Sequence, residues 1–330
     1  MRAWRIGAWL ALLLALPLAG HLVAASAALA HGDDHDDCRI KEIKSVTPLS
    51  ANAGTYTPPS VPSAQAVSIT IGLKTKGEGT CRGSLAFNRP SLPATMGRMG
   101  GGGTLPYAVQ TAAGGGTQLV FSGVDPHGHR LDFTVPSHAH SVTLTVYVLM
   151  QPGLAPIPAG AYVDHLTLQV FNRQDWHLSL VGSRPFTVSG TVAAVCQLPA
   201  PDVASLSFNS AISNGLPNPA IVLTARFTNV SCSAPARIRL SGNRLEPTSP
   251  ISPVANFDNF IHWQASAAFG AASAVLNTRT ASQVTSAVQN VAGGATAGVT
   301  ITVNINLLQG QRVIAGTYSN VLTVTIDPSL

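Results

Sequence analysis

Charged residues are scarce in this chain of 330 amino acids, where they make up only 10% of the sequence. Without Arg2 and Arg5, which lie in a leader considered below, the 19 basic residues become 17 against 14 acidic ones, and the sequence shows no basic cluster. A nucleic-acid partner is therefore not expected, because it needs a concentrated positive patch. Beyond residue 30 there is also no run of about 18 uninterrupted apolar residues, so we expect no membrane-spanning helix in the mature chain.

The motifs of common enzyme classes are absent as well. The chain has no Cys-x-x-Cys pair or Cys/His ligand spacing, and no serine lies in a Gly-x-Ser-x-Gly setting. The run from Gly100 to Gly103 is not followed by Lys-Ser or Lys-Thr, so it is not a phosphate-binding loop. Several acidic residues cluster between Asp33 and Asp37 and suggest no catalytic pair. We predict a protein that is not an enzyme and has no cofactor.

Residues 1–30 have the features of a secretory signal peptide. Arg2 and Arg5 precede an apolar run from Ile6 to Leu18, and the small residues that end in Ala28-Leu-Ala30 form a cleavage site. We therefore expect a protein that is exported. The remaining length is sufficient for two domains of common size.

The mature sequence contains an internal duplication built from short strands. Apolar residues alternate in short runs between Gly- and Pro-rich turns, which is typical of an all-β domain. The motif Ala-Gly-x-Tyr-x-(Asp or Asn)-x-Leu-Thr occurs at 159–167 and again at 315–323, an offset of 156 residues that also relates Tyr107 to Trp263. Cysteines recur at the similar offsets of 158 and 151 residues. These landmarks predict two related domains in tandem.

All four cysteines fall in the exported part, two in each repeat. In an oxidising compartment we expect two disulfides, Cys38 with Cys81 and Cys196 with Cys232. Each would close a loop of roughly 40 residues and contribute about 3 to 4 kcal/mol to stability on the chain-entropy estimate. A metal site is the alternative, but no ligand spacing supports it.

The second repeat carries a recognisable set of motifs. They are Phe186-Thr-Val-Ser-Gly-Thr-Val-Ala-Ala-Val-Cys196, the second cysteine Cys232, a strand centred on Trp263, and the closing Ala-Gly-Thr-Tyr-Ser-Asn-x-Leu-Thr-Val-Thr. From residue 186 to 330 the sequence thus resembles the spore coat protein U domain of archaic chaperone–usher pilins and tip adhesins. The resemblance is looser across residues 38–171. The Trp-Gly pair that is frequent in the middle of such domains is absent.

The resemblance implies two tandem immunoglobulin-like, pilin-type β-sandwich domains, at 31–172 and 186–330, with a joining segment at 173–185. It further implies that the second domain lacks its final strand, which a periplasmic pilus chaperone and then an adjacent pilin subunit would supply at an outer-membrane usher. The closing strand has no following partner of its own, which agrees with this expectation. The predicted acceptor edge consists of Tyr318, Leu322, Val324 and Ile326.

Two further surfaces are predicted for the first domain. Its own missing strand is expected to come from the joining segment, through Leu178, Leu180, Phe186 and Val188. Its loops are expected to hold the adhesive surface, since loops at the end of a sandwich are free to vary. Apolar side chains beside the Gly-rich turn would suit an abiotic or host surface if they are exposed, whereas packing under the loop is an equally weighted alternative. These side chains are Met96, Met99, Leu105 and Tyr107.

The functional prediction is a pilus tip adhesin joined to the fibre by donor-strand complementation. The stretch from His31 to Asp37 has no apolar side chain with which to fill a neighbouring groove, which favours a subunit that accepts a strand without donating one. Two other functions stay open. One is a secreted copper-binding or oxidative protein that uses His31 and His35 as ligands, and the other is a coat protein with the same fold and no pilus.

Overall fold

The computed structural model describes residues 38–60, 62–153, 156–174, 177–288 and 295–329. Within these ranges the secondary structure is β, apart from one 3-10 turn, η1 (Asn209–Ala211). The prediction of an all-β chain is therefore confirmed. No helix in these ranges is long and apolar enough to cross a membrane. The predicted signal peptide and the possible metal ligands His31 and His35 lie outside the described residues.

The strands form two groups with separate buried cores, which we call the first module (residues 38–192) and the second module (residues 196–329). In the first module, β1, β3, β9 and β6 lie side by side and antiparallel as one layer, while β4, β10, β11 and β2 form the other. The short β5 pairs with both β6 and β10 and joins the layers. The strands are β1 (Arg39–Thr47), β2 (Ser50–Tyr56), β3 (Gln65–Lys76), β4 (Thr80–Asn88), β5 (Thr95–Arg98), β6 (Thr104–Gln110), β7 (Val120–Phe121), β8 (Leu131–Pro136), β9 (Ser141–Met150), β10 (Gly160–Gln174) and β11 (His177–Val192).

Strand β11 completes the first module. It runs antiparallel to β10 along nearly the whole of both strands and pairs in parallel with β2 on its other side. Alternate side chains of β11 enter the core, and the ring of Phe186 packs against that of Phe87 with centroids 5.1 Å apart. The predicted domain limits need correction here, because residue 172 lies within β10 and residue 186 lies within β11. Backbone pairing, which sequence composition does not report, carries the first module through to residue 192.

On the side of β1 away from β3, side chains rather than a described strand form hydrogen bonds with its backbone. Bulges in its pairing with β3 leave Lys41 and Lys44 without a partner residue, and so β1 buries every third side chain instead of every second. The Ile40 N–H donates to Asn172 Oδ1 (3.1 Å), and Arg184 Nη2 donates to the Ile43 carbonyl (2.9 Å). Bulges and lysines are common devices that prevent an edge strand from pairing with another chain.

The second module is a sandwich of one five-stranded and one three-stranded sheet. The larger sheet has the order β12-β15-β22-β19-β20, and the smaller has the order β21-β16-β25. Three two-stranded ladders, β13–β14, β17–β24 and β18–β23, complete the described part of this module. Its strands are β12 (Cys196–Gln197), β13 (Ile212–Ser213), β14 (Leu216–Pro217), β15 (Val222–Cys232), β16 (Ala236–Ser241), β17 (Glu246–Pro247), β18 (Phe257–Asp258), β19 (Trp263–Phe269), β20 (Ala272–Asn277), β21 (Gln283–Thr285), β22 (Thr296–Leu307), β23 (Arg312–Val313), β24 (Tyr318–Ser319) and β25 (Thr323–Pro328).

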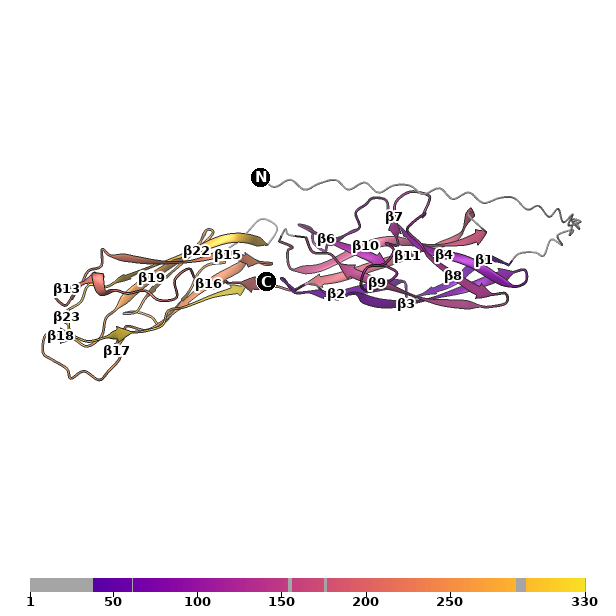
Figure 1. The fold of residues 1–330 in the computed structure, drawn as a ribbon. Coiled ribbons are helices and arrows are strands. Elements are labelled where there is room, and N and C mark those ends of the chain that lie inside the picture. Colours follow the sequence, from indigo (N-terminus) through magenta and orange to yellow (C-terminus); the bar gives the residue numbers. More distant parts are fainter. Residues whose placement is uncertain (1–37, 61, 154–155, 175–176, 289–294, 330) are drawn as a thin grey trace, which may run out of the picture. The chain divides into compact units, whose positions relative to one another are not determined.

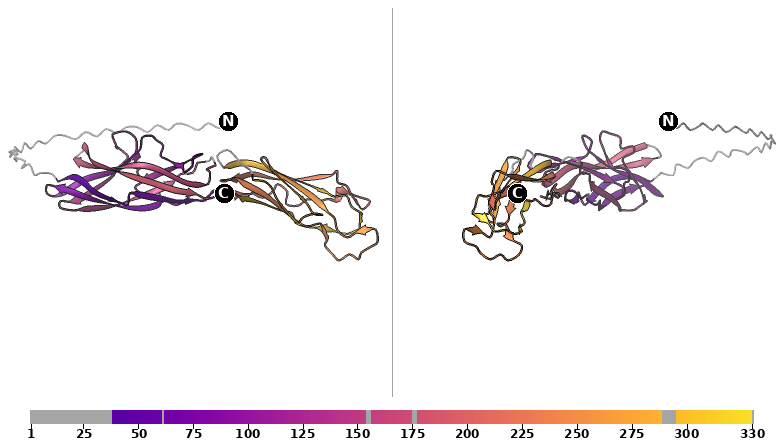
Figure 2. Two further views of the ribbon diagram at one scale, coloured as in Figure 1. Left: turned by 180° about the vertical axis from the view of Figure 1, so that it is seen from behind. Right: turned by 60° about the vertical axis from the view of Figure 1, so that its left-hand side comes forward.

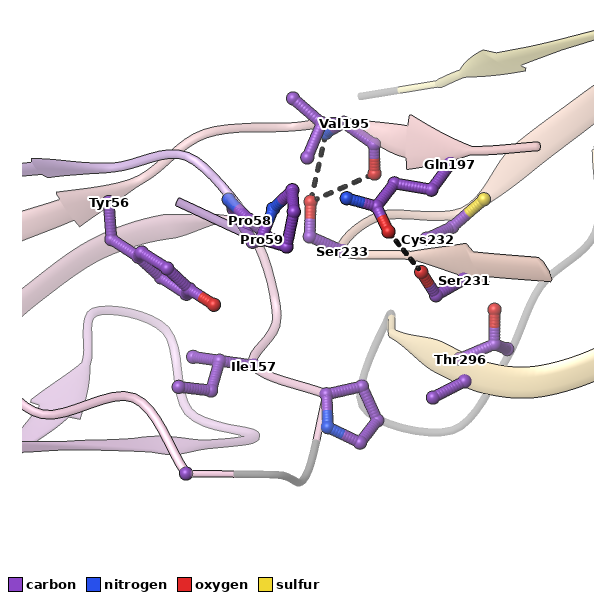
Figure 3. A pocket seen from close by; sticks show the side chains of 13 residues that line it. Tyr56, Pro58, Pro59, Ile157, Val195, Gln197, Ser231, Cys232, Ser233 and Thr296 are labelled. Carbon is purple, nitrogen blue, oxygen red and sulfur yellow. Dashed lines mark hydrogen bonds between the residues drawn. The ribbon is translucent and has the colours of Figure 1, made fainter. Parts of the chain in front are cut away.

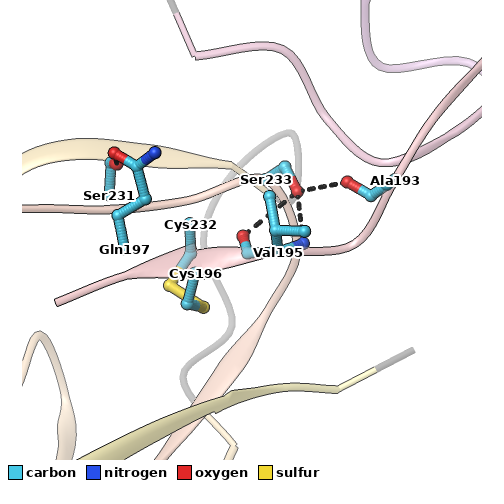
Figure 4. Close-up of a disulfide and its surroundings, with 7 residues drawn as sticks. All are labelled: Ala193, Val195, Cys196, Gln197, Ser231, Cys232 and Ser233. Carbon is cyan, nitrogen blue, oxygen red and sulfur yellow. Dashed lines mark hydrogen bonds between the residues drawn. A yellow bond between two sulfur atoms is a disulfide. The ribbon is translucent and has the colours of Figure 1, made fainter. Parts of the chain in front are cut away.

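Both predicted disulfides are present, Cys38–Cys81 and Cys196–Cys232, with sequence separations of 43 and 36 residues. The second disulfide ties the start of the second module to the end of β15 (Figure 4). Next to it, the Ser233 hydroxyl donates to the Ala193 carbonyl (2.7 Å) and accepts from the Val195 N–H (2.9 Å). The Ser231 hydroxyl also reaches the Gln197 side chain (Figure 3). The entry of the chain into the second module is therefore fixed by covalent and polar contacts.

Candidate functional site

The backbone of β25 is paired on one side only. Among the described residues β25 pairs with β16, with Val324 opposite Leu240 and Ile326 opposite Ile238. The Ser329 N–H donates to the Pro235 carbonyl (2.6 Å), which fixes the phase of the antiparallel ladder. Because hydrogen-bonded pairs alternate with non-bonded ones, the N–H and C=O groups of Val324 and Ile326 point away from β16. The second module thus presents an open strand edge.

An apolar groove of about 670 Å³ lies beside this edge. Strands of the larger sheet line it through Phe227 of β15, Trp263 of β19 and Ile305 of β22. The stretch that contains Leu206 and Phe208 also lines the groove, as do Tyr318, Val321, Leu322 and Val324. Leu206, Phe208, Leu322 and Val324 are only partly buried, and Val321 is 72% exposed. Apolar side chains between the two sheets therefore remain accessible to solvent.

The lining of the groove carries no charged side chain. Its polar side chains are those of serine, threonine, asparagine, tyrosine and tryptophan, and none of its lining residues is Asp, Glu, Lys, Arg or His. The Tyr318 hydroxyl is hydrogen-bonded to the Ile314 carbonyl (2.8 Å). Elsewhere in the described part of the chain, no group of three or more His, Cys, Asp or Glu side chains could hold a metal ion. An extended apolar segment is the kind of ligand that fits both the groove and the open edge.

Both modules have the same tyrosine hydrogen bond at the start of the equivalent strand. The Tyr162 hydroxyl donates to the Pro158 carbonyl (2.6 Å), and the Tyr318 hydroxyl donates to the Ile314 carbonyl (2.8 Å), in each case four residues back. Such a tyrosine contact is a feature of immunoglobulin-type sandwiches. In the first module, the strand that follows this tyrosine is covered by β11, whereas in the second module the corresponding β25 has no such neighbour among the described residues. The two modules therefore differ at the equivalent strand: the edge of β10 is paired with β11, and the edge of β25 is open among the described residues.

The structure places the predicted acceptor residues on two separate pieces of chain. Tyr318 belongs to β24, which pairs with β17, while Val324 and Ile326 belong to β25. Tyr318, Leu322 and Val324 line the groove, but Ile326 is buried and does not line it. The lining stretch between Pro201 and Phe208 was not predicted as part of the site. The apolar residues Leu206 and Phe208, two positions apart, are the only signal in the sequence that could have indicated it.

The four predicted internal donor residues have different environments. Phe186 and Val188 are buried in the core of the first module. Leu178 packs with Phe121 and Phe171 in a small separate cluster. Leu180 is 55% exposed and does not contribute to the core, because a register shift at Phe171 interrupts the alternation of β11 at this point.

The predicted adhesive loop requires correction. Met96, Leu105 and Tyr107 are fully buried in strands β5 and β6, and only Met99 is exposed, at 66%. The Gly-rich turn also lies beside Pro158 and Tyr162 at the start of β10, where β11 ends, since Gly160 is opposite Val192. The turn is therefore at the end of the first module from which the chain leaves it. Packing of β5 against β6 and β10 buries these side chains.

Tyr107 belongs to a buried polar network. Its hydroxyl donates to Asp164 Oδ2 (2.7 Å), and Arg89 Nε donates to the same oxygen (2.8 Å). Arg89 also donates to the carbonyls of Ser91 and Thr95. Burial, together with the hydrogen bond to the Asp164 carboxylate, raises the pKa of Tyr107 well above its ordinary value of 10.0. The network links β6 to β10, and Tyr107 remains neutral within it.

This raised pKa predicts a loss of stability at high pH. The folded state holds Tyr107 neutral, so its contribution is complete below pH of about 10, where the unfolded tyrosine begins to ionise, and falls as the pH rises further. We expect Tyr107→Phe to lower the free energy of unfolding by about 1 to 3 kcal/mol at pH 7. Above pH 10 the free energy of unfolding should fall less steeply in this variant than in the wild type. Denaturant unfolding between pH 8 and 11.5, with Tyr147→Phe as the control, measures both effects; equal slopes for Tyr107→Phe and wild type would contradict the prediction.

Comparison with known proteins gives distant similarities only. No protein-family model matches this chain, and no curated protein sequence matches it. Among solved structures, the complex of the chaperone CsuC with the tip adhesion subunit CsuE from archaic Csu pili of Acinetobacter baumannii has a TM-score of 0.39 and 13% identity over 86% of this chain and 100% of that one. The CupB6 tip adhesin of Pseudomonas aeruginosa has a TM-score of 0.35 and 11% identity, over 88% and 92% of the two chains. CfaE, the adhesive subunit of CFA/I fimbria of enterotoxigenic Escherichia coli, has a TM-score of 0.34 and 11% identity, over 85% and 93%. At these TM-scores and identities the similarities are too distant to assign a role to this chain.

Proposed function

We propose that this protein is a non-enzymatic subunit of a surface pilus assembled by the chaperone–usher route. The observation that carries the proposal is the uncharged groove beside the open edge of β25. A strand from a periplasmic chaperone occupies the groove during export, and a strand from the adjacent pilin subunit replaces it at the outer-membrane usher. The ligand's backbone pairs with Val324 and Ile326, and its alternate side chains enter between the two sheets.

The contrast between two strand edges supports this assignment. At β1 the chain has bulges and lysines, and side chains of Asn172 and Arg184 occupy the backbone groups. The pairing of β25 has no bulge, and the strand has no lysine. Asp327 and Pro328 lie at the end of β25, while the part that contains Val324 and Ile326 carries no charge. An open edge with apolar side chains is an aggregation hazard unless a partner covers it. A strand ligand removes both the exposed apolar area and the unpaired backbone groups.

We further propose that the subunit lies at the pilus tip. The first module fills its equivalent edge with its own β11, so it offers no corresponding acceptor and is free to face an abiotic or host surface. The second module then connects the protein to the fibre. The resemblance to the spore coat protein U domain supports the same role, while the copper-binding alternative depends on His31 and His35 and stays a prediction from the sequence.

The test is co-expression of the exported chain with a periplasmic pilus chaperone of the same organism, followed by purification from the periplasm and native mass spectrometry. We expect a one-to-one complex, and little soluble subunit when the chaperone is absent. As a control, the same chaperone with a charged residue in its donated strand should fail to stabilise the subunit, because an unpaired charge is costly in an apolar groove. A soluble, folded subunit that needs no chaperone and forms no complex would refute the proposal.

A further inference from the structure

All four lysines of the chain lie on two neighbouring strands of the first module. Lys41 and Lys44 are on β1, and Lys74 and Lys76 are on β3, which pairs with β1. Some 30 residues of sequence separate the two pairs, so the cluster exists only in the folded sheet. The two strands together carry five basic residues, including Arg39, against the single acid Glu42. We call the four lysines on these paired strands the lysine face.

The lysine side chains are free to meet a ligand. All four are exposed, and within the described ranges none of them forms a salt bridge or a side-chain hydrogen bond. Arg39 lies opposite Lys76, and Glu42 lies opposite Lys74. β9 pairs with β3 only as far as Gly72, so Lys74 and Lys76 lie beyond that pairing and have β1 as their only strand neighbour among the described residues. The four lysines are therefore gathered at one end of the β1–β3 pair.

A row of hydroxyl groups continues the same face. Along β3 the exposed alternation runs from Lys76 and Lys74 to Thr70 and Ser68. Thr70 is hydrogen-bonded to Thr143 (2.9 Å) and Ser68 to Thr145 (3.5 Å), both on β9. Lysine positions whose Cα atoms are about 7 Å apart along the strand are thus followed by hydroxyl pairs. No aromatic side chain lies in β1 or β3, and the β9 row that carries Thr143 and Thr145 continues to one aromatic residue, the half-buried Tyr147.

We propose that the lysine face binds an acidic polysaccharide. A polymer of uronic acids presents repeated carboxylates for the lysines and hydroxyls for the serine and threonine row, and its length lets it span both. Single-stranded nucleic acid would need aromatic side chains for stacking, and a membrane-binding face would combine cations with exposed apolar residues. Neither is present on these strands. This inference does not depend on strand acceptance by the second module.

The test measures binding of the full exported chain to alginate at low ionic strength and in about 0.5 M salt, where exposed charges are screened. We expect binding that is lost in high salt and absent for neutral dextran. Because a lysine near an anionic surface contributes on the order of 1 kcal/mol, Lys74→Gln with Lys76→Gln should weaken binding about tenfold or more. Lys41→Gln with Lys44→Gln provides a second, independent pair on β1.

Arg226→Gln with Arg312→Gln is the matched control, because both arginines are exposed in the second module and the change in net charge is the same. This control should bind alginate like the wild type. Equal weakening in all variants would mean a general charge effect and would overturn the proposal, as would unchanged binding in both lysine variants. Tighter binding to anionic lipid vesicles or to single-stranded DNA than to alginate would also overturn it.

Discussion

Phe186→Ala should lower the free energy of unfolding of the first module by about 3 to 5 kcal/mol, the usual cost of removing a large aromatic side chain from a core. Phe186 is buried and packs against Phe87 across the interior. It also belongs to β11, which is the strand that covers β10. Loss of its ring removes the main apolar anchor of the filling strand and leaves a cavity beside β4.

The measurement is hydrogen exchange followed by mass spectrometry, because peptides from β10 and β22 report the two modules separately. Exchange in β10 should become faster in Phe186→Ala, whereas exchange in β22 should not change. Leu180→Ala is the matched control on the same strand, since Leu180 is 55% exposed and its loss should change stability by no more than about 0.5 kcal/mol. If the two variants behave alike, β11 does not stabilise the first module through its core-facing side chains.

A second copy of residues 177–192, joined after Leu330 by a Gly/Ser linker of about five residues, should stabilise the second module. The appended strand can form a hairpin with β25, pair with the free groups of Val324 and Ile326, and place its Phe and Val side chains in the groove. Burying two such side chains contributes about 3 to 6 kcal/mol. In a module of this size that corresponds to a rise in Tm of roughly 10 °C or more.

Two controls make this experiment specific. An appended copy that carries serine in place of the residues corresponding to Phe186 and Val188 should give little stabilisation, because it fills the edge but not the groove. Leu322→Arg in the extended protein should remove the gain, while Thr323→Arg, on the exposed side of the strand, should keep it. Equal Tm values for the extended protein and the original chain would show that the groove does not accept a strand.

The repeated motif around Tyr162 and Tyr318 marks the start of the equivalent strand in each module, and it could be read from the sequence because turns and alternation are local. The disulfides could also be assigned from the sequence, since each repeat contains only two cysteines. The burial of Met96, Leu105 and Tyr107 could not be assigned, because it depends on β5 and β6 packing against β10, whose residues lie more than 50 positions away. For the same reason the limits of the first module were placed too early.

By itself, the sequence determined that the chain is all-β, that it is duplicated, that each repeat holds one disulfide, and that its last strand alternates like a half-buried one. These properties follow from composition, spacing and periodicity, which act between neighbours in the sequence. Only the tertiary structure decided that β11 fills the edge of one module while the edge of β25 stays open beside an apolar groove. It alone also brought Lys41 and Lys44 beside Lys74 and Lys76, because strand register is set by backbone hydrogen bonds and core packing between segments that are far apart in the chain.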